Sequence, residues 1–469
     1  MRKVLAPLFA LVLLATPARA ADPVPALPDA VTFAEHVAPL VFANCTACHR
    51  PGEVAPFTLT TYADTKKKAK TMLRAMQDKQ MPPWHPEPGH GEFRDERRLS
   101  ATQIALFAKW VETGMAEGDA AKTPALPKFP EGWRIGTPDL IVKMDKPFVV
   151  PAAGPDLYQN FVIPLDLKED KWVTAVEFRS TAPATVHHVL YHLDDSGRAR
   201  AADAKTPEPG FPGIGFRQTG TLGGWAVGGT PAKLPDGLAL PLKKGSDLVL
   251  QTHFHPSGKA ESETLTVGIY FADKAPPRLL SGIQLPPVFG LFSGMTIPAG
   301  KADYTVTDSF TLPVDVELVG VGAHAHYLGK AMTATATLPD KTEKKLFQIK
   351  DWDFNWQGQY FYKEFVKLPK GTVIRASVTW DNSAENPRNP SSPPVDVKWG
   401  ETTGDEMGAI SFRAVTPVEA DTPTLRAATR RHAGEAYAKL RLQGKDVEWK
   451  RLGVDPTEVL RQLPIGPKK

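Results

Sequence analysis

Residues 320–330 read "GVGAHAHYLGK", and they place two histidines, His324 and His326, one residue apart in a small and apolar stretch. Alternate side chains of a β-strand point to the same face, so a strand here would put both imidazoles on one side of a sheet. The whole chain of 469 residues has only 12 histidines. This pair therefore raises the question of whether the strand binds a metal, and the rest of the sequence has to supply the partners.

The sequence around this stretch predicts an all-β structure. From about residue 136, short apolar runs alternate with Gly, Pro and Asp turns, in a chain with 37 Gly and 45 Pro. This pattern is typical of sandwiches, and roughly 280 residues suit two of them. We expect one sandwich at 136–275, a second at 276–420, and a basic helical tail at 421–469.

Histidines gather at three places in this β region. Single strand histidines are usually satisfied polar groups, but crowded imidazoles repel one another below their pKa unless a metal or neutrality organises them. The region has no H-E-x-x-H motif and no cysteine, which argues against a zinc protease and against blue copper. Nitrogen donors with an added thioether suit copper. The three places are His187, His188 and His192; His253 and His255; and His324 and His326.

The two cysteines of the chain lie together in "CTACH" at residues 45–49. Cys45 and Cys48 followed by His49 form the C-x-x-C-H haem attachment sequence, in which two thiols bind the haem covalently and the histidine ligates the iron. The alternative is a redox-active dithiol. We predict a covalently bound haem c.

The flanking sequence predicts three helices around this motif, at 32–49, 62–80 and 99–115. Ser100 and Gln103 have the spacing of a capping box at the start of the third helix. This arrangement resembles a class I cytochrome c domain at 21–117, followed by a Pro-rich linker at 118–135. Met81, in "KQMPPWHP", resembles the distal ligand of small cytochromes c, with His85 and His90 as alternatives; His36 is expected to be an ordinary helix residue.

The first residues predict export. Residues 1–20 combine a basic start, an apolar run and a small-x-small cleavage site, as a signal peptide does, and no later run is long enough to span a membrane. Removing them takes away Arg2, Lys3 and Arg19, so 56 basic against 52 acidic residues become 53 against 52. A nearly neutral chain gives no reason to expect nucleic acid as a partner. We expect a periplasmic protein.

Four stretches of the β region, which are listed below in chain order, resemble the copper type II, ascorbate-dependent monooxygenases. This is the family of peptidylglycine α-hydroxylating monooxygenase and dopamine β-monooxygenase. The resemblance covers about residues 135–418. It implies two jelly-roll-like sandwiches that each hold one copper, one with three histidines for electron transfer and one with two histidines and a methionine for O2. The stretches are "HHVLYH" (187–192), "LGGWAVGGTPAKLPDGLALPLKKGSDLVLQTHF" (222–254), "GAHAHYLGK" (322–330) and "TTGDEMGAISF" (402–412).

The family's ligand sets carry over residue by residue. The resemblance implies that His187, His188 and His253 bind the electron-transfer copper. It also implies that His324, His326 and Met407 bind the oxygen copper and are the catalytic set. Gln251 matches a family glutamine whose role here is open.

Some assignments stay open. His192 and His255 could be copper ligands or could support ligands, and we favour the second role. Met407 could also be an ordinary core residue. The aromatic stretch at 351–362 could line a substrate site or be core. The animal enzymes carry disulfides and use ascorbate, whereas this chain has no spare cysteine and carries its own haem motif.

These features together predict a copper-dependent monooxygenase that takes electrons from a periplasmic donor through haem c. It would insert one atom of O2 into a C–H bond of an unknown small organic substrate. The alternative is a non-catalytic electron-transfer or copper-binding protein on the same scaffold. A copper oxidase that makes peroxide without a substrate is a third option.

Overall fold

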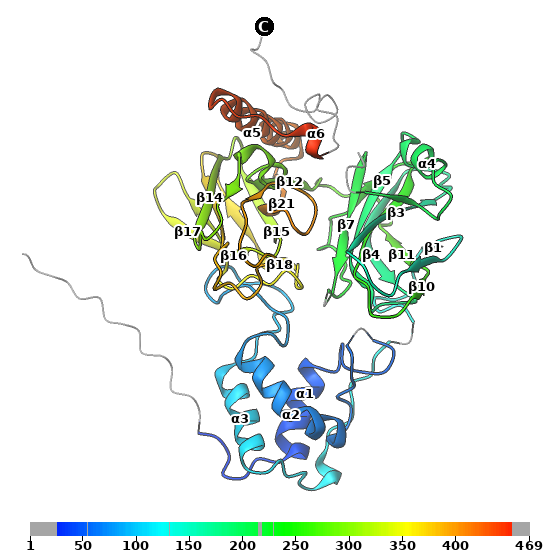
Figure 1. The fold of residues 1–469 in the computed structure, drawn as a ribbon, viewed down its shortest axis with the longest axis vertical. Coiled ribbons are helices and arrows are strands. Elements are labelled where there is room, and N and C mark those ends of the chain that lie inside the picture. The colour runs from blue at the N-terminus through cyan, green and yellow to red at the C-terminus, as the bar shows by residue number, and fades with distance from the viewer. Residues whose placement is uncertain (1–25, 54, 131, 214–217, 228, 453–469) are drawn as a thin grey trace, which may run out of the picture.

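The computed structural model describes residues 26–53, 55–130, 132–213, 218–227 and 229–452. The predicted signal peptide at 1–20 lies outside the described residues. The chain forms a helical lobe and two β lobes, and Figure 1 shows the two β lobes side by side above the helices. Each lobe has its own hydrophobic core, so the buried residues fall into three main clusters.

The helical lobe holds four helical elements that lie within the three predicted segments. Apolar side chains of these helices, including Phe33, Phe107 and Trp110, form one buried cluster. The third helix begins at the predicted capping box: Ser100 accepts from the Gln103 amide, and Gln103 accepts from the Ser100 amide. The elements are η1 (Phe33–Val37), α1 (Ala38–Asn44), α2 (Tyr62–Gln77) and α3 (Ala101–Glu112), and the short η2 (Ala120–Lys122) follows in the predicted linker.

The first β lobe is a sandwich of two antiparallel sheets. Alternate residues of the strands point inward, and side chains from both sheets meet in one core. One sheet has the order β1 (Leu140–Lys143), β11 (Thr266–Phe271), β4 (Lys171–Arg179), β8 (Leu240–Leu242). The other has the order β6 (Phe211–Pro212), β3 (Leu157–Pro164), β9 (Asp247–Phe254), β5 (Val186–Asp194), β7 (Gly220–Ala226). The pair β2 (Phe148–Val150) and β10 (Glu261–Glu263) and the helix α4 (Arg198–Asp203) complete the lobe.

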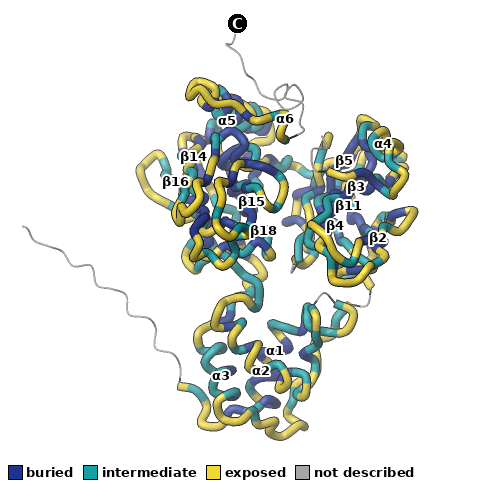
Figure 2. Tube along the Cα trace, viewed as in Figure 1, coloured by how far each residue is buried: buried dark blue, intermediate teal, exposed yellow. Residues whose placement is uncertain are grey.

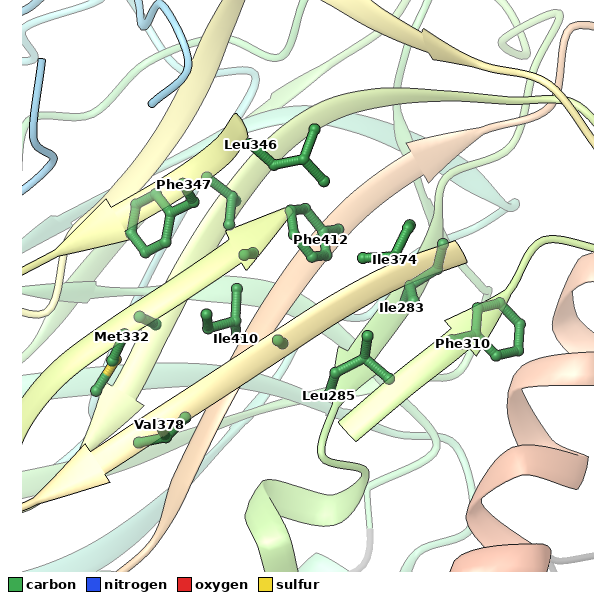
Figure 3. Close-up of a cluster of buried hydrophobic side chains, with 14 of the residues drawn as sticks. Ile283, Leu285, Phe310, Met332, Leu346, Phe347, Ile374, Val378, Ile410 and Phe412 are labelled. Atoms are coloured by element: carbon green, nitrogen blue, oxygen red, sulfur yellow. The ribbon is translucent and has the colours of Figure 1, made fainter. Parts of the chain in front are cut away.

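The second β lobe is also a sandwich. Figure 3 shows part of its core, where Phe412 and Ile410 of one sheet face Met332, Ile374 and Val378 of the other. One sheet has the order β12 (Ser281–Leu285), β21 (Gly408–Val415), β15 (Val316–Ala325), β18 (Gln359–Leu368). The other has the order β14 (Tyr304–Thr311), β19 (Val373–Trp380), β16 (Gly329–Thr337), β17 (Glu343–Ile349). The pair β13 (Thr296–Ile297) and β20 (Val397–Lys398) and the helix η3 (Val288–Ser293) lie beside them. The prediction of β-sandwich domains is confirmed.

The C-terminal helix covers one side of the second sandwich. It follows η4 (Glu419–Asp421), runs as α5 (Thr422–Leu442), and is followed by α6 (Trp449–Leu452). Leu425, Tyr437 and Leu440 of α5 are buried in the same core as the strands. Figure 2 shows that the outward side of this helix is largely exposed. Among the described residues, no helix is long and apolar enough to cross a membrane.

A segment of the helical lobe is built into the second sandwich. Phe93 is only 2% exposed and belongs to the core of that sandwich, where its ring stacks on Tyr362 with centroids 5.0 Å apart. Backbone bonds hold both sides of the segment, from the Glu87 amide to the Gln348 carbonyl and from the Arg94 amide to the Phe361 carbonyl, each 2.8 Å. Residues 84–94, which we call the docking segment, therefore fix the helical lobe to the second sandwich rather than leave it on a free linker.

Candidate metal centres

Three of the predicted ligands meet on two neighbouring strands of the first sandwich. His187 and His188 lie on β5 and His253 lies on β9, and one ligand atom from each can be chosen so that all three lie within 4.8 Å of one another. Consecutive strand residues normally point to opposite faces. Here the register shifts between Val186 and His188, and this bulge lets both histidines turn toward His253. We call these three residues the first cluster.

Two histidines of the first cluster are held neutral, and the cluster has nitrogens without a hydrogen-bond partner among the described residues. Burial, with the neighbouring His253, lowers the pKa of His187 to about 3 and that of His188 well below its usual value. The Nε2 of His187 and the Nδ1 of His253 are buried without a hydrogen-bond partner among the described residues. Buried polar atoms normally have partners, so these two orphaned nitrogens fit a metal ion that would accept their lone pairs.

A carboxylate orients the third histidine of the first cluster. Asp156 lies 2.8 Å from His253 Nε2 and, through its other oxygen, 2.8 Å from His255 Nδ1. Burial alone raises the pKa of Asp156, but these two hydrogen bonds lower it overall. An Nε2–H that donates to Asp156 leaves Nδ1 of His253 as the ligand atom. Tyr158 stacks on the same imidazole with centroids 4.4 Å apart, which fixes its plane.

The second pair of predicted ligands lies at the end of β15. The rings of His324 and His326 are 5.1 Å apart and nearly perpendicular. His324 Nδ1 lies 2.6 Å from Gln357 Oε1, and His326 Nδ1 lies 3.0 Å from the Asp405 carbonyl. Each Nδ1–H therefore donates to an oxygen, which leaves both Nε2 atoms as ligand atoms. Burial lowers the pKa of His324 and lowers that of His326 to about 3, so both rings are neutral.

Met407 lies next to this pair by strand register. Ala325 pairs with Gly408 across β15 and β21, so the next positions outward are His326 and Met407. Met407 is half-buried and also packs against the edge of the sandwich core. Both readings of this methionine, thioether ligand and core residue, are compatible with that position. We call His324, His326 and Met407 the second cluster.

Glu406 is a residue of this site that the sequence did not single out. Its buried carboxyl group accepts from the amides of His326 and Leu328 and from the Trp380 indole, at 2.9, 2.6 and 3.0 Å. Burial raises its pKa to about 8 despite these bonds. It ties the turn after β15 to the residue that precedes Met407. An acidic residue beside a candidate methionine ligand in "GDEMG" was the only signal for it.

One phenyl ring lies between the two clusters. Phe354, from the aromatic stretch at 351–362, stacks on His187 with centroids 4.8 Å apart and lies 5.7 Å from His326. Its side chain is buried, at 3% exposure. The clusters are therefore close neighbours across the contact of the two sandwiches, although they come from distant parts of the sequence.

The other histidines of the β region lie outside the first cluster. His192 is buried, its pKa is lowered to about 4 by burial, and it is hydrogen-bonded to Gln251. His255 is exposed and reaches the cluster only through Asp156. His432 of α5 pairs with Asp308 of β14 at 2.8 Å.

The predicted haem segment has a suitably held histidine. His49 Nδ1 lies 3.1 Å from the Phe57 carbonyl, and this bond leaves Nε2 as the atom that could ligate iron. Cys45 and Cys48 lie on one turn, in which the amides of Cys48 and His49 both donate to the Cys45 carbonyl. Burial raises the pKa of the Cys45 thiol to about 12, which disfavours a reactive dithiol. These residues fit a covalently held haem.

The three candidates for the distal ligand of the haem iron, Met81, His85 and His90, lie in different surroundings. Met81 is half-buried, and its amide donates to the Ala75 carbonyl at 3.1 Å. His85 is in the docking segment and packs on Trp352 of the second sandwich, with centroids 5.8 Å apart. His90 is close to its own turn, 3.2 Å from the Pro88 carbonyl. His36 bonds to Thr32 at the start of η1, as expected of a helix residue.

Comparisons with known proteins do not identify a family. No family model and no curated protein matches the chain. Among solved structures, the major capsid protein P2 of bacteriophage PM2 is 8% identical over 59% of this chain and 97% of its own, with a TM-score of 0.23. A peptide-N(4)-(N-acetyl-β-D-glucosaminyl) asparagine amidase is 14% identical over 60% and 97%, also with a TM-score of 0.23. Likenesses this weak support no conclusion about function.

Proposed function

We propose that this chain is an exported haem- and copper-dependent monooxygenase. In this proposal it resembles the copper type II, ascorbate-dependent monooxygenases, with a class I cytochrome c domain ahead of the two jelly-roll-like sandwiches. The observation that carries the proposal is the first cluster: His187, His188 and His253 bring three nitrogen donors within 4.8 Å of one another. Two of these residues have a buried nitrogen that lacks any partner among the described residues.

Each candidate site has its own residues. The first cluster would hold one copper and the second cluster the other, while Cys45 and Cys48 would hold the haem, with His49 and Met81 as iron ligands. When bound, these groups would supply two electrons and activate O2, so that one oxygen atom enters a substrate C–H bond and the other leaves as water. The helical lobe is then the expected entry point for electrons from a periplasmic donor.

The surrounding residues of the chain orient the ligands and exclude water. Asp156, Gln357 and the Asp405 carbonyl each bind the non-ligating nitrogen of one histidine, which fixes its tautomer. Phe354 fills the space between the clusters. A substrate would therefore have to approach the second cluster from a side that this ring leaves open.

The first test is metal content. We expect one haem and two coppers per purified chain, and one copper after the double change His324→Ala and His326→Ala. The variant His432→Gln is the matched control, because it removes a histidine that pairs with Asp308 far from both clusters. A wild-type chain with no copper or one copper would contradict the proposal.

The second test is chemistry with O2. The copper-loaded wild type should reoxidise its reduced haem faster than the His324→Ala/His326→Ala variant does. Under labelled O2, mass spectrometry should detect a hydroxylated product that Met407→Ala loses. Equal reoxidation by both proteins would refute the enzymatic role, and peroxide without a labelled product would indicate an oxidase instead.

A non-catalytic electron-transfer or copper-binding protein is the alternative, and the position of Phe354 favours it. The ring covers His187 and lies beside His326, so it reduces the open space at the clusters. This alternative predicts stable copper binding and haem oxidation without any labelled product.

A further inference from the structure

A strained loop lies beside the second cluster. It is the start of η3, where Val288, Phe289 and Gly290 have φ angles of 51°, 50° and 85°. Glycine adopts this left-handed region readily, but a β-branched or bulky side chain there is an outlier. Such conformations persist only where the surroundings hold them, and they concentrate at functional sites and switch regions.

Neighbouring residues hold the loop in this conformation. The Phe289 amide donates to Gln284 Oε1 at 3.0 Å, and the Phe289 carbonyl accepts from the Trp399 indole at 2.9 Å. A Cβ added to Gly290 would lie 3.2 Å from the Gly408 carbonyl, which is tighter than ordinary van der Waals contact. The loop therefore rests on the start of β21, next to the second cluster.

The strained conformation places a phenyl ring against a predicted copper ligand. The rings of Phe289 and His324 are nearly perpendicular, with centroids 5.3 Å apart, and Phe289 is 37% exposed. His324 is half-buried, whereas His326 is only 3% exposed. Of the two imidazoles, His324 is thus the one nearer to solvent, and the Phe289 ring shields part of it from water.

Burial of the ring explains little of this strain. A phenyl ring that stays 37% exposed gains only part of the free energy that full burial would give. The hydrogen bond from the Phe289 amide to Gln284 is itself exposed to solvent, so water could replace it. A rotation of Val288 and Phe289 out of the left-handed region would therefore release the strain and carry the ring away from His324.

We propose that Phe289 is a gate residue of the second cluster. Its ring closes the solvent side of His324, and the strain at Val288 and Phe289 makes the opening movement easy, because the open loop relaxes to an ordinary backbone conformation. Control of what reaches His324 follows from the loop alone. The role of the gate in admitting O2 and substrate rests on the proposed function.

Chemical modification of His324 tests the gate without copper. The probe is diethyl pyrocarbonate, which reacts with neutral imidazole, and the sample is the haem-loaded full chain after a chelator has removed copper. Nε2 of His324 should react, because Nδ1 is held by Gln357. Mass spectrometry of peptides measures the rate, and the exposed His255 is the internal reference.

Two changes in the loop should have opposite effects on this rate. Phe289→Ala removes the ring and should raise the rate at least about 10-fold, since a minor open state is usually populated at no more than about a tenth. Val288→Asn keeps the ring and should slow the reaction several-fold, because asparagine tolerates the left-handed region and stabilises the closed loop. Leu126→Ala, which removes a side chain of similar exposure (41%) from the linker, is the control and should leave the rate unchanged.

Equal rates in the wild type and Phe289→Ala would overturn the proposal. An unchanged or faster reaction in Val288→Asn would also overturn it, because a ring that is only a static cover would not respond to the strain. Circular dichroism and an unchanged rate at His255 should show that the variants are folded.

Azide binding to the copper-loaded full chain separates the gate from the proposed function. Stopped-flow absorption without O2 measures it, and the signal that is lost in His324→Ala/His326→Ala belongs to the second cluster. Binding should be fastest in Phe289→Ala, slower in the wild type and slowest in Val288→Asn. This order without a labelled product would leave the gate standing and refute the enzymatic role. A labelled product with equal azide rates would leave the function standing and remove the gate.

Discussion

The two histidine clusters are built by different means. The first cluster takes its three imidazoles from two adjacent strands, β5 and β9, and a charged carboxylate, Asp156, orients one of them. The second cluster takes two imidazoles from one strand end, and neutral oxygens of Gln357 and Asp405 orient them. Two paired strands and the bulge between Val186 and His188 thus assemble the first cluster, whereas the second depends on the loops around residues 357 and 405.

This difference suggests how each cluster could fail. Copper binding at the first cluster should be weakened mainly by changes of a ligand histidine or of the Asp156 carboxylate that orients His253. The second cluster should be disturbed by changes that destabilise the loops around residues 357 and 405, even where no ligand residue is changed. Three predictions test the contrast, from the largest expected effect to the smallest.

Removal of His253 should abolish copper binding at the first cluster. Its imidazole is the one that joins β9 to the two histidines of β5. We expect His253→Ala to bind one copper instead of two, a larger loss than the roughly 10–100-fold that follows removal of a supporting residue. Copper content by mass spectrometry measures this. His255→Ala, a change of the exposed neighbour, should retain two coppers, and equal losses from both variants would contradict the assignment.

Replacement of Glu406 by leucine should destabilise the second sandwich. The amides of His326 and Leu328 would lose their acceptor, at about 1–3 kcal/mol each, whereas the Trp380 indole would keep its bond to the Met407 carbonyl, so the free energy of unfolding should fall by about 2–6 kcal/mol. A drop of roughly 10 °C in the melting temperature of this domain is expected. Differential scanning calorimetry measures it.

Glu406→Gln is the control for that change, because it keeps one carbonyl oxygen as an acceptor. It should cost only about 1–2 kcal/mol. If glutamine and leucine are equally damaging, the hydrogen bonds of Glu406 are not what holds the turn after β15.

The supporting residues of the two clusters should differ in their effect on copper affinity. Asp156→Asn removes a charge and should weaken binding at the first cluster about 10–100-fold. Gln357→Leu removes only a neutral acceptor, so we expect a loss below about 10-fold at the second cluster. Competition with a chelator measures both affinities, and a larger loss from Gln357→Leu would reverse the contrast.

The candidate metal and haem ligands could be predicted from the sequence because their residue types and their spacing are typical of such ligands. Cysteines and histidines spaced as C-x-x-C-H or H-x-H are uncommon in segments that bind neither haem nor metal. Asp156 was not found as a site residue, and Phe354 and Gln357 were covered only by the aromatic stretch at 351–362, which was left open between substrate site and core, since an aspartate, a glutamine or a phenylalanine is common everywhere. Only their contacts with the histidines distinguish them. Gln357 is 33 residues from His324 in the sequence, and Asp156 is 97 residues from His253.

By itself, the sequence determined the chemistry available: two thiols beside a histidine, three groups of imidazoles, and alternating apolar runs that require β-sandwiches. These are local properties, because residue type and periodicity are fixed by neighbours in the chain. The tertiary structure decided the bulge that turns His187 and His188 together, the burial of Phe93 in a distant core, and the contact of the Phe289 ring with His324. Such features arise from packing between segments far apart in sequence, and no local pattern specifies them.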